Sequence, residues 1–264
     1  MSAVSDLLAE AQSRIDDALG PAPADVDRPE AVRSADDLAG RIDHTLLKAD
    51  ATQAAIVELC AEAREFGFAS VCVNTRWVPL AAEELADSPV MVCTVVGFPL
   101  GAMARRAKAA EAEIAVAEGA DEVDMVLDIG GLLSGDLAAV YEDMVAVADG
   151  ASPAPVKVIL ETALLTDEQK VIACLLALRS GVAYVKTSTG FGGGGASAAD
   201  IELMRAAVGD QLGVKASGGI RTRDDAERMI AAGADRVGAS ASVSIVAGEA
   251  DSDSGQGGAG EDDY

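Results

Sequence analysis

Eight short apolar runs, each followed by a segment of helical character, organise this chain from about residue 41 to residue 247. The runs begin at Arg41, Ala69, Val90, Asp121, Val156, Val182, Val214 and Asp235. Alanine-rich segments with helical periodicity lie between them, among them 52–66, 103–118, 137–148, 166–180 and 223–232. Near-continuous apolar strands that alternate with helices are typical of a parallel sheet covered by helices. Eight such units predict an α/β fold, the closed (β/α)8 or TIM barrel.

The chain of 264 residues is long enough for one large domain, a common size for a single α/β barrel. We expect the barrel to span residues 41–247. Residues 1–40 are predicted to form an amphipathic helix over 5–19 and a proline-containing linker. Residues 248–264 carry no apolar side chain except alanine before Tyr264, so this acidic tail is predicted to be disordered.

The composition is strongly acidic, with 44 Asp and Glu against 20 Lys and Arg and a formal net charge of -24. This balance argues against nucleic acid as a partner, because phosphate backbones bind clusters of Lys and Arg. An acidic, lysine-poor chain with ordinary apolar content fits a protein solvated in concentrated salt, where charge repulsion is screened. We therefore predict a halophilic protein of archaeal-type composition.

The chain shows no sign of a membrane segment, a signal peptide or a metal centre. No apolar stretch approaches the roughly 20 residues that span a bilayer, and the N-terminal segment carries acids among its apolar residues. The four cysteines are widely spaced without a CxxC pair, and the chain has one histidine. We expect a cytoplasmic protein with reduced thiols and no metal.

Two lysines in consecutive runs, Lys186 and Lys215, are the strongest candidates for chemistry. The chain holds six lysines against 14 arginines, so a lysine within an apolar run needs a reason. Neighbouring strands lie about 5 Å apart, so the two amines can meet, and both like charge and burial favour the neutral form of one of them. A lysine attacks at neutral pH when its pKa falls from about 10.4 to near 7. The pattern predicts a nucleophilic lysine; the alternative is that each lysine snorkels or pairs with an acid.

Acidic residues in other runs can share the barrel interior with these lysines. In the run at 121–127, alternation places Glu122 and Asp124 on one face, and Asp124 is the predicted interior carboxylate for proton transfer. Its alternative role is a buried salt bridge. Asp43 in the first run is a second, weaker candidate. Lys157 and Glu161 share a face of the fifth run, which predicts a structural ion pair as readily as a catalytic role.

Glycines gather after the last three runs, where they favour phosphate binding. The candidate ligands are Gly190, Gly192, Gly218, Gly219 and Gly238, with Arg221 as a cation and Ser240 as a hydroxyl. Loops after the seventh and eighth strands of a barrel often bind phosphate through backbone N–H groups and helix N-termini. The pattern predicts a phosphorylated substrate; the alternative is that the glycines only make the loops flexible.

Seven segments resemble the deoxyribose-phosphate aldolase family along the chain from Arg41 to Ala247. They are IDHTLLKADAT, FASVCVN, VVGFPLGA, GADEVDMV, KVILET, YVKTSTGF and VKASGGIRT. The resemblance implies a class I aldolase that reversibly cleaves 2-deoxy-D-ribose 5-phosphate to D-glyceraldehyde 3-phosphate and acetaldehyde. It also implies that the reaction needs no metal or other cofactor and belongs to deoxynucleoside catabolism.

The resemblance also implies roles for individual residues. The family's Schiff-base lysine falls on Lys186, the lysine that lowers its pKa falls on Lys215, and the proton-relay aspartate falls on Asp124. The strand-one aspartate of the family matches Asp43, and Cys72 is expected to line the site without being required.

The chain departs from some family members at two positions. Phe191 stands where some carry a basic phosphate ligand, and Ala241 stands where a second serine is common. The terminal Tyr264 is a hypothetical contributor to proton transfer.

The alternatives to this function are another class I aldolase of a phosphosugar and a non-catalytic barrel that binds a phosphorylated metabolite. Barrels of this kind often assemble, so a homo-oligomer, a dimer or tetramer, is expected.

Overall fold

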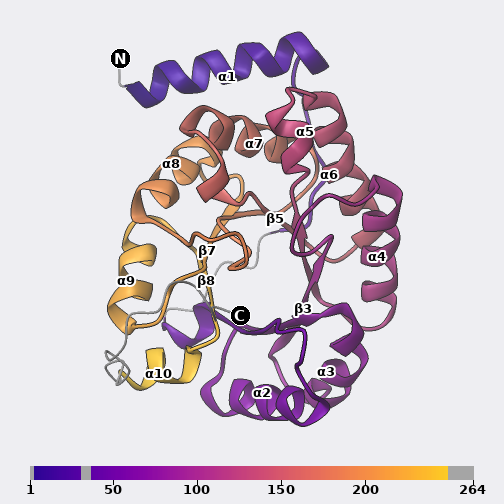
Figure 1. The fold of residues 1–264 in the computed structure, drawn as a ribbon, viewed down its shortest axis with the longest axis vertical. Coiled ribbons are helices and arrows are strands. Elements are labelled where there is room, and N and C mark those ends of the chain that lie inside the picture. The colour runs from indigo at the N-terminus through magenta and orange to yellow at the C-terminus, as the bar shows by residue number, and fades with distance from the viewer. Residues whose placement is uncertain (1–2, 31–36, 249–264) are drawn as a thin grey trace.

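The computed structural model describes residues 3–30 and 37–248. Its centre is a closed barrel of eight parallel strands in the order β1 to β8, with helices around the outside (Figure 1). The strands are β1 Ile42–Leu46, β2 Ser70–Asn74, β3 Met91–Val96, β4 Glu122–Val126, β5 Val156–Ile159, β6 Tyr184–Lys186, β7 Gly213–Ser217 and β8 Arg236–Ala239. The predicted (β/α)8 fold is confirmed.

The helices predicted over 5–19, 52–66, 103–118, 137–148, 166–180 and 223–232 are present, with ends that differ by up to three residues. The helices are α1 Ala3–Leu19, α2 Gln53–Phe66, α3 Val78–Leu85, α4 Arg105–Ala117, α5 Ile129–Leu133, α6 Leu137–Ala151, α7 Asp167–Arg179, α8 Ala198–Val208, α9 Arg223–Ala231 and α10 Ser242–Ala247. Their ends follow from local chemistry. Thr166 forms a capping box with Gln169 at the start of α7, and Gly67 adopts the left-handed conformation that ends α2.

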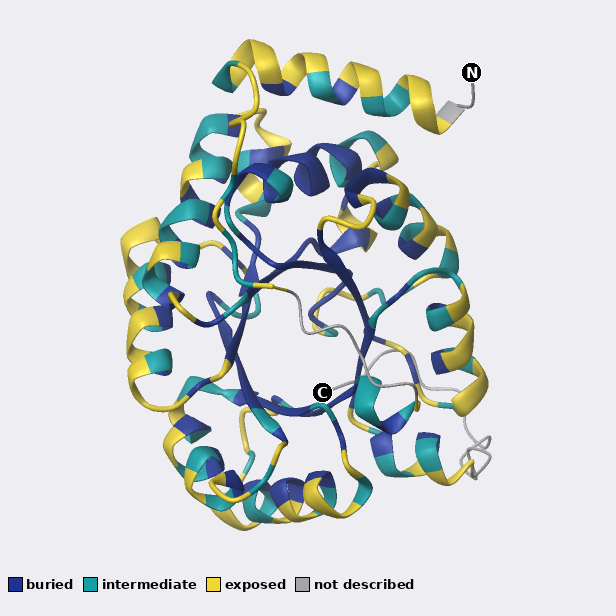
Figure 2. Ribbon diagram, turned by 180° about the vertical axis from the view of Figure 1, so that it is seen from behind, coloured by how far each residue is buried: buried dark blue, intermediate teal, exposed yellow. Residues whose placement is uncertain are grey.

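The apolar core lies between the strands and the helices. Figure 2 shows the barrel as a buried ring inside helices that are exposed on their outer faces. The outward residues of the strands, among them Val71, Val123 and Val214, are fully buried against the helices. Valine, leucine, isoleucine and alanine supply most of this core, as the small aromatic content requires.

The helix α1 packs outside the barrel against α7 (Figure 1). Its apolar face buries Ala11 and Ile15 completely, and Asp16 forms an ion pair with Arg179 at the end of α7. The predicted N-terminal helix is therefore confirmed. The predicted disordered tail and Tyr264 lie outside the described residues. Within the described ranges, no helix is long and apolar enough to cross a membrane.

Candidate active site

The interior of the barrel is polar instead of apolar. Barrel interiors are usually filled by layers of four side chains from alternate strands, with Val, Ile and Leu dominating. Here the strand register builds three layers: Ser70, Glu122, Tyr184 and Arg236; then Asp43, Cys93, Lys157 and Lys215; then Cys72, Asp124, Lys186 and Gly238. All twelve residues are buried. The charged side chains must therefore stabilise one another.

Six of these charged side chains form a closed ring in which carboxylates and cations alternate. In order around the ring they are Arg236, Asp43, Lys215, Asp124, Lys157 and Glu122. We call this set the charge ring. It holds three carboxylates and three cations, so its formal charge is zero when every member is ionised. A balanced ring of this kind offsets the cost of burying each charge.

Asp124 is the centre of the lysine contacts. Its Oδ1 accepts a hydrogen bond from Lys157 Nζ at 2.9 Å, and its Oδ2 accepts from Lys215 Nζ at 2.8 Å and Lys186 Nζ at 2.9 Å. Burial alone raises the pKa of Asp124, but the three neighbouring lysines outweigh burial and hold this pKa well below its usual value. Asp124 is therefore an ionised carboxylate shared by three lysines.

Lys215 occupies the ring between two carboxylates. Its Nζ lies 2.5 Å from Asp43 Oδ2 and 2.8 Å from Asp124 Oδ2. Burial lowers the pKa of Lys215, yet the two carboxylates outweigh it and hold this pKa well above its usual value. In the same way, burial raises the pKa of Asp43, while Arg236 and Lys215 bring it below the usual value. Lys215 is therefore held in its protonated form at neutral pH.

Lys186 lies beside the charge ring and is not part of it. Its Cα is paired with that of Lys215 across β6 and β7, which confirms the predicted proximity of the two lysines. Among the described residues, Asp124 is the one carboxylate within ion-pair distance of Lys186 Nζ. That carboxylate is already shared with two ring lysines. Among these three lysines, Lys186 is thus the one that the carboxylates of the ring leave without a counter-charge of its own.

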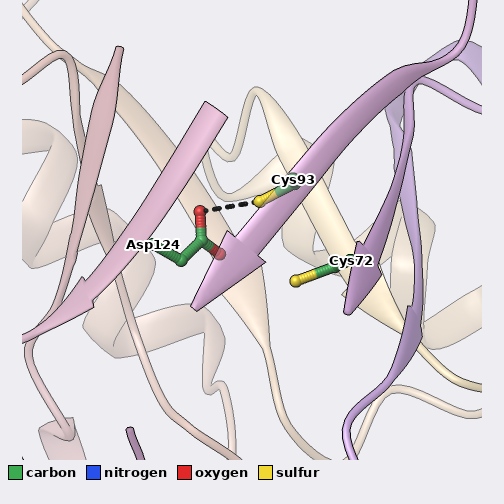
Figure 3. Close-up of side chains that lie close together, drawn as sticks. All are labelled: Cys72, Cys93 and Asp124. Carbon is green, nitrogen blue, oxygen red and sulfur yellow. Dashed lines mark hydrogen bonds between the residues drawn. The ribbon is translucent and has the colours of Figure 1, made fainter. Parts of the chain in front are cut away.

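The two cysteines of the interior lie next to Asp124 (Figure 3). The Cys93 S–H donates to Asp124 Oδ1 at 3.2 Å, and Cys72 is opposite Cys93 on β2. These sulfurs and an Asp124 oxygen lie within 4.8 Å of one another, close enough to suggest a metal site. The donor set does not fit one, because Asp124 already accepts bonds from three lysines and a metal ion would meet their ammonium groups. Burial also raises the pKa of the Cys93 thiol well above its usual value.

Lys157 and Glu161 do not form the predicted ion pair. Lys157 Nζ instead contacts Glu122 at 2.8 Å and Asp124. The alternation that placed Glu161 on the same face stops at the end of β5, because Glu161 adopts a left-handed backbone with φ 57°. Its carboxylate accepts hydrogen bonds from the backbone N–H and hydroxyl of Thr189. Glu161 thus ties the end of β5 to the loop after β6.

Four of the glycines predicted to bind phosphate lie in two neighbouring loops, one after β6 and one after β7. Gly190 and Gly192 follow β6, while Gly218 and Gly219 follow β7 with φ of 90° and 72°. The two loops approach closely, since a Cβ on Gly195 would lie 2.4 Å from the carbonyl oxygen of Gly218. This backbone geometry requires residues without side chains.

The other predicted phosphate ligands lie around the end of the barrel. Arg221 and Ser240 are exposed on loops after β7 and β8. Gly238 lies within β8, where a Cβ would meet Lys215 Cε at 3.1 Å. Its position is explained by room for Lys215 in the barrel interior.

Sequence reasoning missed most of the layer formed by Ser70, Glu122, Tyr184 and Arg236, which we call the lowest layer. Arg236 donates to Asp43 and Glu122, and Tyr184 fills the space left by Gly213, whose Cβ would lie 2.1 Å from the Tyr184 ring. The period-two pattern already placed Glu122 on the face of Asp124. Arg236 gave no such signal, because a charged residue at the start of a strand resembles ordinary surface charge.

A closed barrel with a lysine beside a buried, balanced charge cluster is an arrangement suited to an enzyme that attacks a carbonyl through an amine. Comparison with known proteins makes the class specific. Residues 38–251 match the DeoC/LacD family aldolase, and the chain belongs to this family.

Similar proteins of known name cover most of the chain. A deoxyribose-phosphate aldolase from Bacillus cereus is 58% identical over 214 residues, which are 81% of this chain and 96% of that protein. A crystal structure of a putative deoxyribose-phosphate aldolase from Coccidioides immitis has a TM-score of 0.80 at 39% identity, covering 93% of this chain and 97% of that one.

A third protein of this name is similar as well. The deoxyribose phosphate aldolase from Aeropyrum pernix, whose structure is described as tetrameric, has a TM-score of 0.76 at 33% identity. The comparison covers 94% of this chain and 97% of that one.

Proposed function

We propose that this aldolase reversibly cleaves 2-deoxy-D-ribose 5-phosphate to D-glyceraldehyde 3-phosphate and acetaldehyde, through a Schiff base on Lys186. The observation that carries the proposal is the position of Lys186 outside a balanced charge ring, 2.9 Å from Asp124. The 58% identity to a deoxyribose-phosphate aldolase over 81% of the chain supports this substrate.

In the synthetic direction, the neutral amine of Lys186 attacks the carbonyl carbon of acetaldehyde and forms a carbinolamine. Loss of water gives an iminium, which acts as the electron sink for removal of a methyl proton. The resulting enamine carbon attacks the aldehyde of glyceraldehyde 3-phosphate and forms the new C–C bond. Hydrolysis of the product imine returns Lys186 to the free amine, and no cofactor takes part.

Asp124 and Lys215 are placed to move the protons of these steps. Asp124 Oδ2 lies 2.9 Å from Lys186 Nζ and 2.8 Å from Lys215 Nζ, so one oxygen joins the reacting amine to a cation. Through a water molecule, this pair can deliver the proton needed to expel hydroxide from the carbinolamine and can accept the methyl proton. Asp43 holds Lys215 from the other side.

The phosphate of the substrate binds, in this proposal, at the loops after β6, β7 and β8. Gly218 and Gly219 have left-handed backbones in the loop after β7, and Arg221 and Ser240 add a cation and a hydroxyl at the rim. Phe191 packs edge-on against Phe98 with ring centroids 5.2 Å apart. We infer that this aromatic pair is an apolar wall beside the phosphate loops.

The decisive experiment is borohydride reduction with acetaldehyde, followed by peptide mass analysis, together with a coupled assay on 2-deoxyribose 5-phosphate in molar salt. Wild type should gain a reduced two-carbon adduct at Lys186, and Lys186→Ala should lose turnover and the adduct. Lys170→Ala is the matched control, because Lys170 pairs with Asp167 and Asp200 outside the barrel. An active Lys186→Ala enzyme, or an adduct on another lysine, would overturn the assignment.

The choice of donor separates this reaction from that of other phosphosugar aldolases. We expect turnover with acetaldehyde as donor and none with dihydroxyacetone phosphate, measured in the synthetic direction.

We further expect a cytoplasmic homo-oligomer, a dimer or a tetramer, without nucleic-acid or membrane partners. Light scattering after size exclusion in molar salt measures the oligomeric state.

A further inference from the structure

Arg236 closes the charge ring on the side away from Lys186. Its Nε lies 2.9 Å from Asp43 Oδ1, and its Nη1 and Nη2 lie 3.3 and 3.1 Å from the two oxygens of Glu122. The guanidinium is 1% exposed. A planar guanidinium is suited to bind two carboxylates at once in a fixed geometry.

We propose that Arg236, together with Glu122, is a positioning residue for the aldol reaction: it fixes Asp43 and Lys157 and completes the charge balance that leaves Lys186 as the surplus amine. The inference rests on the proposed Schiff-base function, and it assigns a catalytic consequence to the lowest layer of the barrel.

The positioning part follows from how the carboxylate oxygens are divided. Arg236 occupies Asp43 Oδ1, so Oδ2 is the oxygen that faces Lys215 Nζ at 2.5 Å. Without Arg236, both oxygens of Asp43 are available to Lys215 and can draw its amine away from Asp124. On the other side of the ring, Glu122 Oε2 is shared between Arg236 and Lys157 Nζ at 2.8 Å. Arg236 therefore restrains both Lys215 and Lys157, the two ring lysines that contact Asp124.

The charge part follows from counting the ring. Removing Arg236 leaves three carboxylates against two cations, and a proton on Lys186 then restores neutrality. Removing the charge of Glu122 leaves two carboxylates against three cations, so the same proton would add to an excess of positive charge. Substitutions at these two positions should thus shift the pH dependence of the reaction in opposite directions, although neither residue contacts Lys186.

Other titratable or polar groups near the ring do not cancel this effect. They are Ser70, within 3.4 Å of Arg236; Tyr184, beside Lys157; and Cys72 and Cys93, beside Asp124. Burial raises the pKa of Tyr184 to about 12 and that of Cys93 well above its usual value. The pKa of Cys72 is lowered, chiefly by its hydrogen bond with Cys93, so Cys72 is the one of these groups to follow separately. A Cys72→Ser background removes its titration from the profiles.

A purely structural role for the lowest layer predicts a different result. A layer that only plugs the barrel would, when substituted, lower stability or the amount of active enzyme and leave the pH profile unchanged. The direction of the pH shift therefore separates positioning and charge balance from simple packing.

The experiment compares Arg236→Met, Arg236→Lys and Glu122→Gln by the pH profile of kcat/KM and by the pH dependence of borohydride trapping. For Arg236→Met we expect kcat/KM to fall about 10- to 100-fold, mostly through kcat, because a displaced catalytic group can cost on the order of 100-fold. The acid limb should move to higher pH in Arg236→Met and to lower pH in Glu122→Gln. Arg236→Lys, which keeps the charge, should keep the wild-type limb.

Arg179→Met is the matched control, since Arg179 is also buried and paired, with Asp16 and the Gly20 carbonyl, but lies outside the barrel. It should lower the unfolding midpoint and leave the acid limb in place. If Arg236→Met does not fold, Arg236→Lys and Glu122→Gln still decide. Limbs that do not move, or that move in the same direction in Arg236→Met and Glu122→Gln, overturn the inference. A wild-type enzyme without an adduct at Lys186 instead overturns the proposed function.

Discussion

Replacing Asp124 by Asn removes the one charge that the three lysines share. The substitution conserves the shape of the side chain, so it leaves no cavity. It changes the balance of the interior, because the charge ring then holds two carboxylates and three cations, with Lys186 beside them. The change therefore tests both the stability of the barrel and the proton transfer assigned to Asp124.

The size of the effect can be worked out from the contacts. Each lysine nitrogen lies 2.8–2.9 Å from an Asp124 oxygen, a separation that gives about 6 kcal/mol of attraction for a protonated lysine at an effective dielectric constant of 20. Most of this attraction offsets the cost of burying the charges. Removing one partner of a buried pair costs about 3–5 kcal/mol, a large part of a total stability of about 5–15 kcal/mol. Loss of a positioned acid or base lowers turnover by about 10²- to 10⁴-fold.

Urea unfolding and steady-state cleavage of 2-deoxyribose 5-phosphate should be measured on the same preparations. Asp143→Asn is the control, because Asp143 is buried and pairs with Lys108 at 2.6 Å between α4 and α6, away from the barrel interior. We expect both variants to lose stability and Asp124→Asn alone to lose activity. An Asp124→Asn enzyme within about threefold of wild-type kcat/KM would refute the assigned role, since the expected loss is at least about 100-fold.

Three further substitutions or conditions test the structure. The pKa values of Asp43 and Asp124 are both lowered, so the stabilisation that their ionised carboxylates give is present above about pH 4 and is lost as the solution becomes more acidic. The free energy of unfolding measured with urea should therefore fall by up to about 2.7 kcal/mol per pH unit below pH 4, and by less in Asp43→Asn. Gly213→Ala should destabilise the fold by about 1–3 kcal/mol or more, because the new methyl group meets the Tyr184 ring; the thermal midpoint measures this. Thr166→Ala removes the cap of α7 and should cost about 1 kcal/mol in urea unfolding with kcat unchanged.

The meeting of Lys186 and Lys215 could be predicted from sequence because it depends on local facts. Consecutive strands of a parallel barrel are neighbours, and alternation with period two says which residues point inward. The same two rules placed Asp124 in the interior. Neither rule needs the way in which the barrel closes, so these residues could be assigned before any coordinates were known.

The contacts of Arg236 and Glu161 could not be predicted, for two different physical reasons. Arg236 on β8 meets Asp43 on β1 only because the sheet closes, and the register of closure is a property of the whole barrel. Glu161 leaves the expected face because its backbone is left-handed, a conformation that sequence alternation cannot reveal for a non-glycine residue. The halophilic prediction concerns the surface charge and remains a prediction.

The polar interior joins the stability of this barrel to its reactivity. Six buried charges would be costly in a fold whose interior is usually aliphatic, and they are tolerated because they neutralise one another in a ring. The apolar core that drives folding lies outside the strands, between sheet and helices, so the interior is free to carry chemistry. A ring with equal numbers of carboxylates and cations, with one further lysine beside it, differs from a cluster in which every cation has its own carboxylate. The balance that stabilises the ring leaves Lys186 as the one of the three lysines outside it, and the proposed nucleophilic role of Lys186 rests on this arrangement.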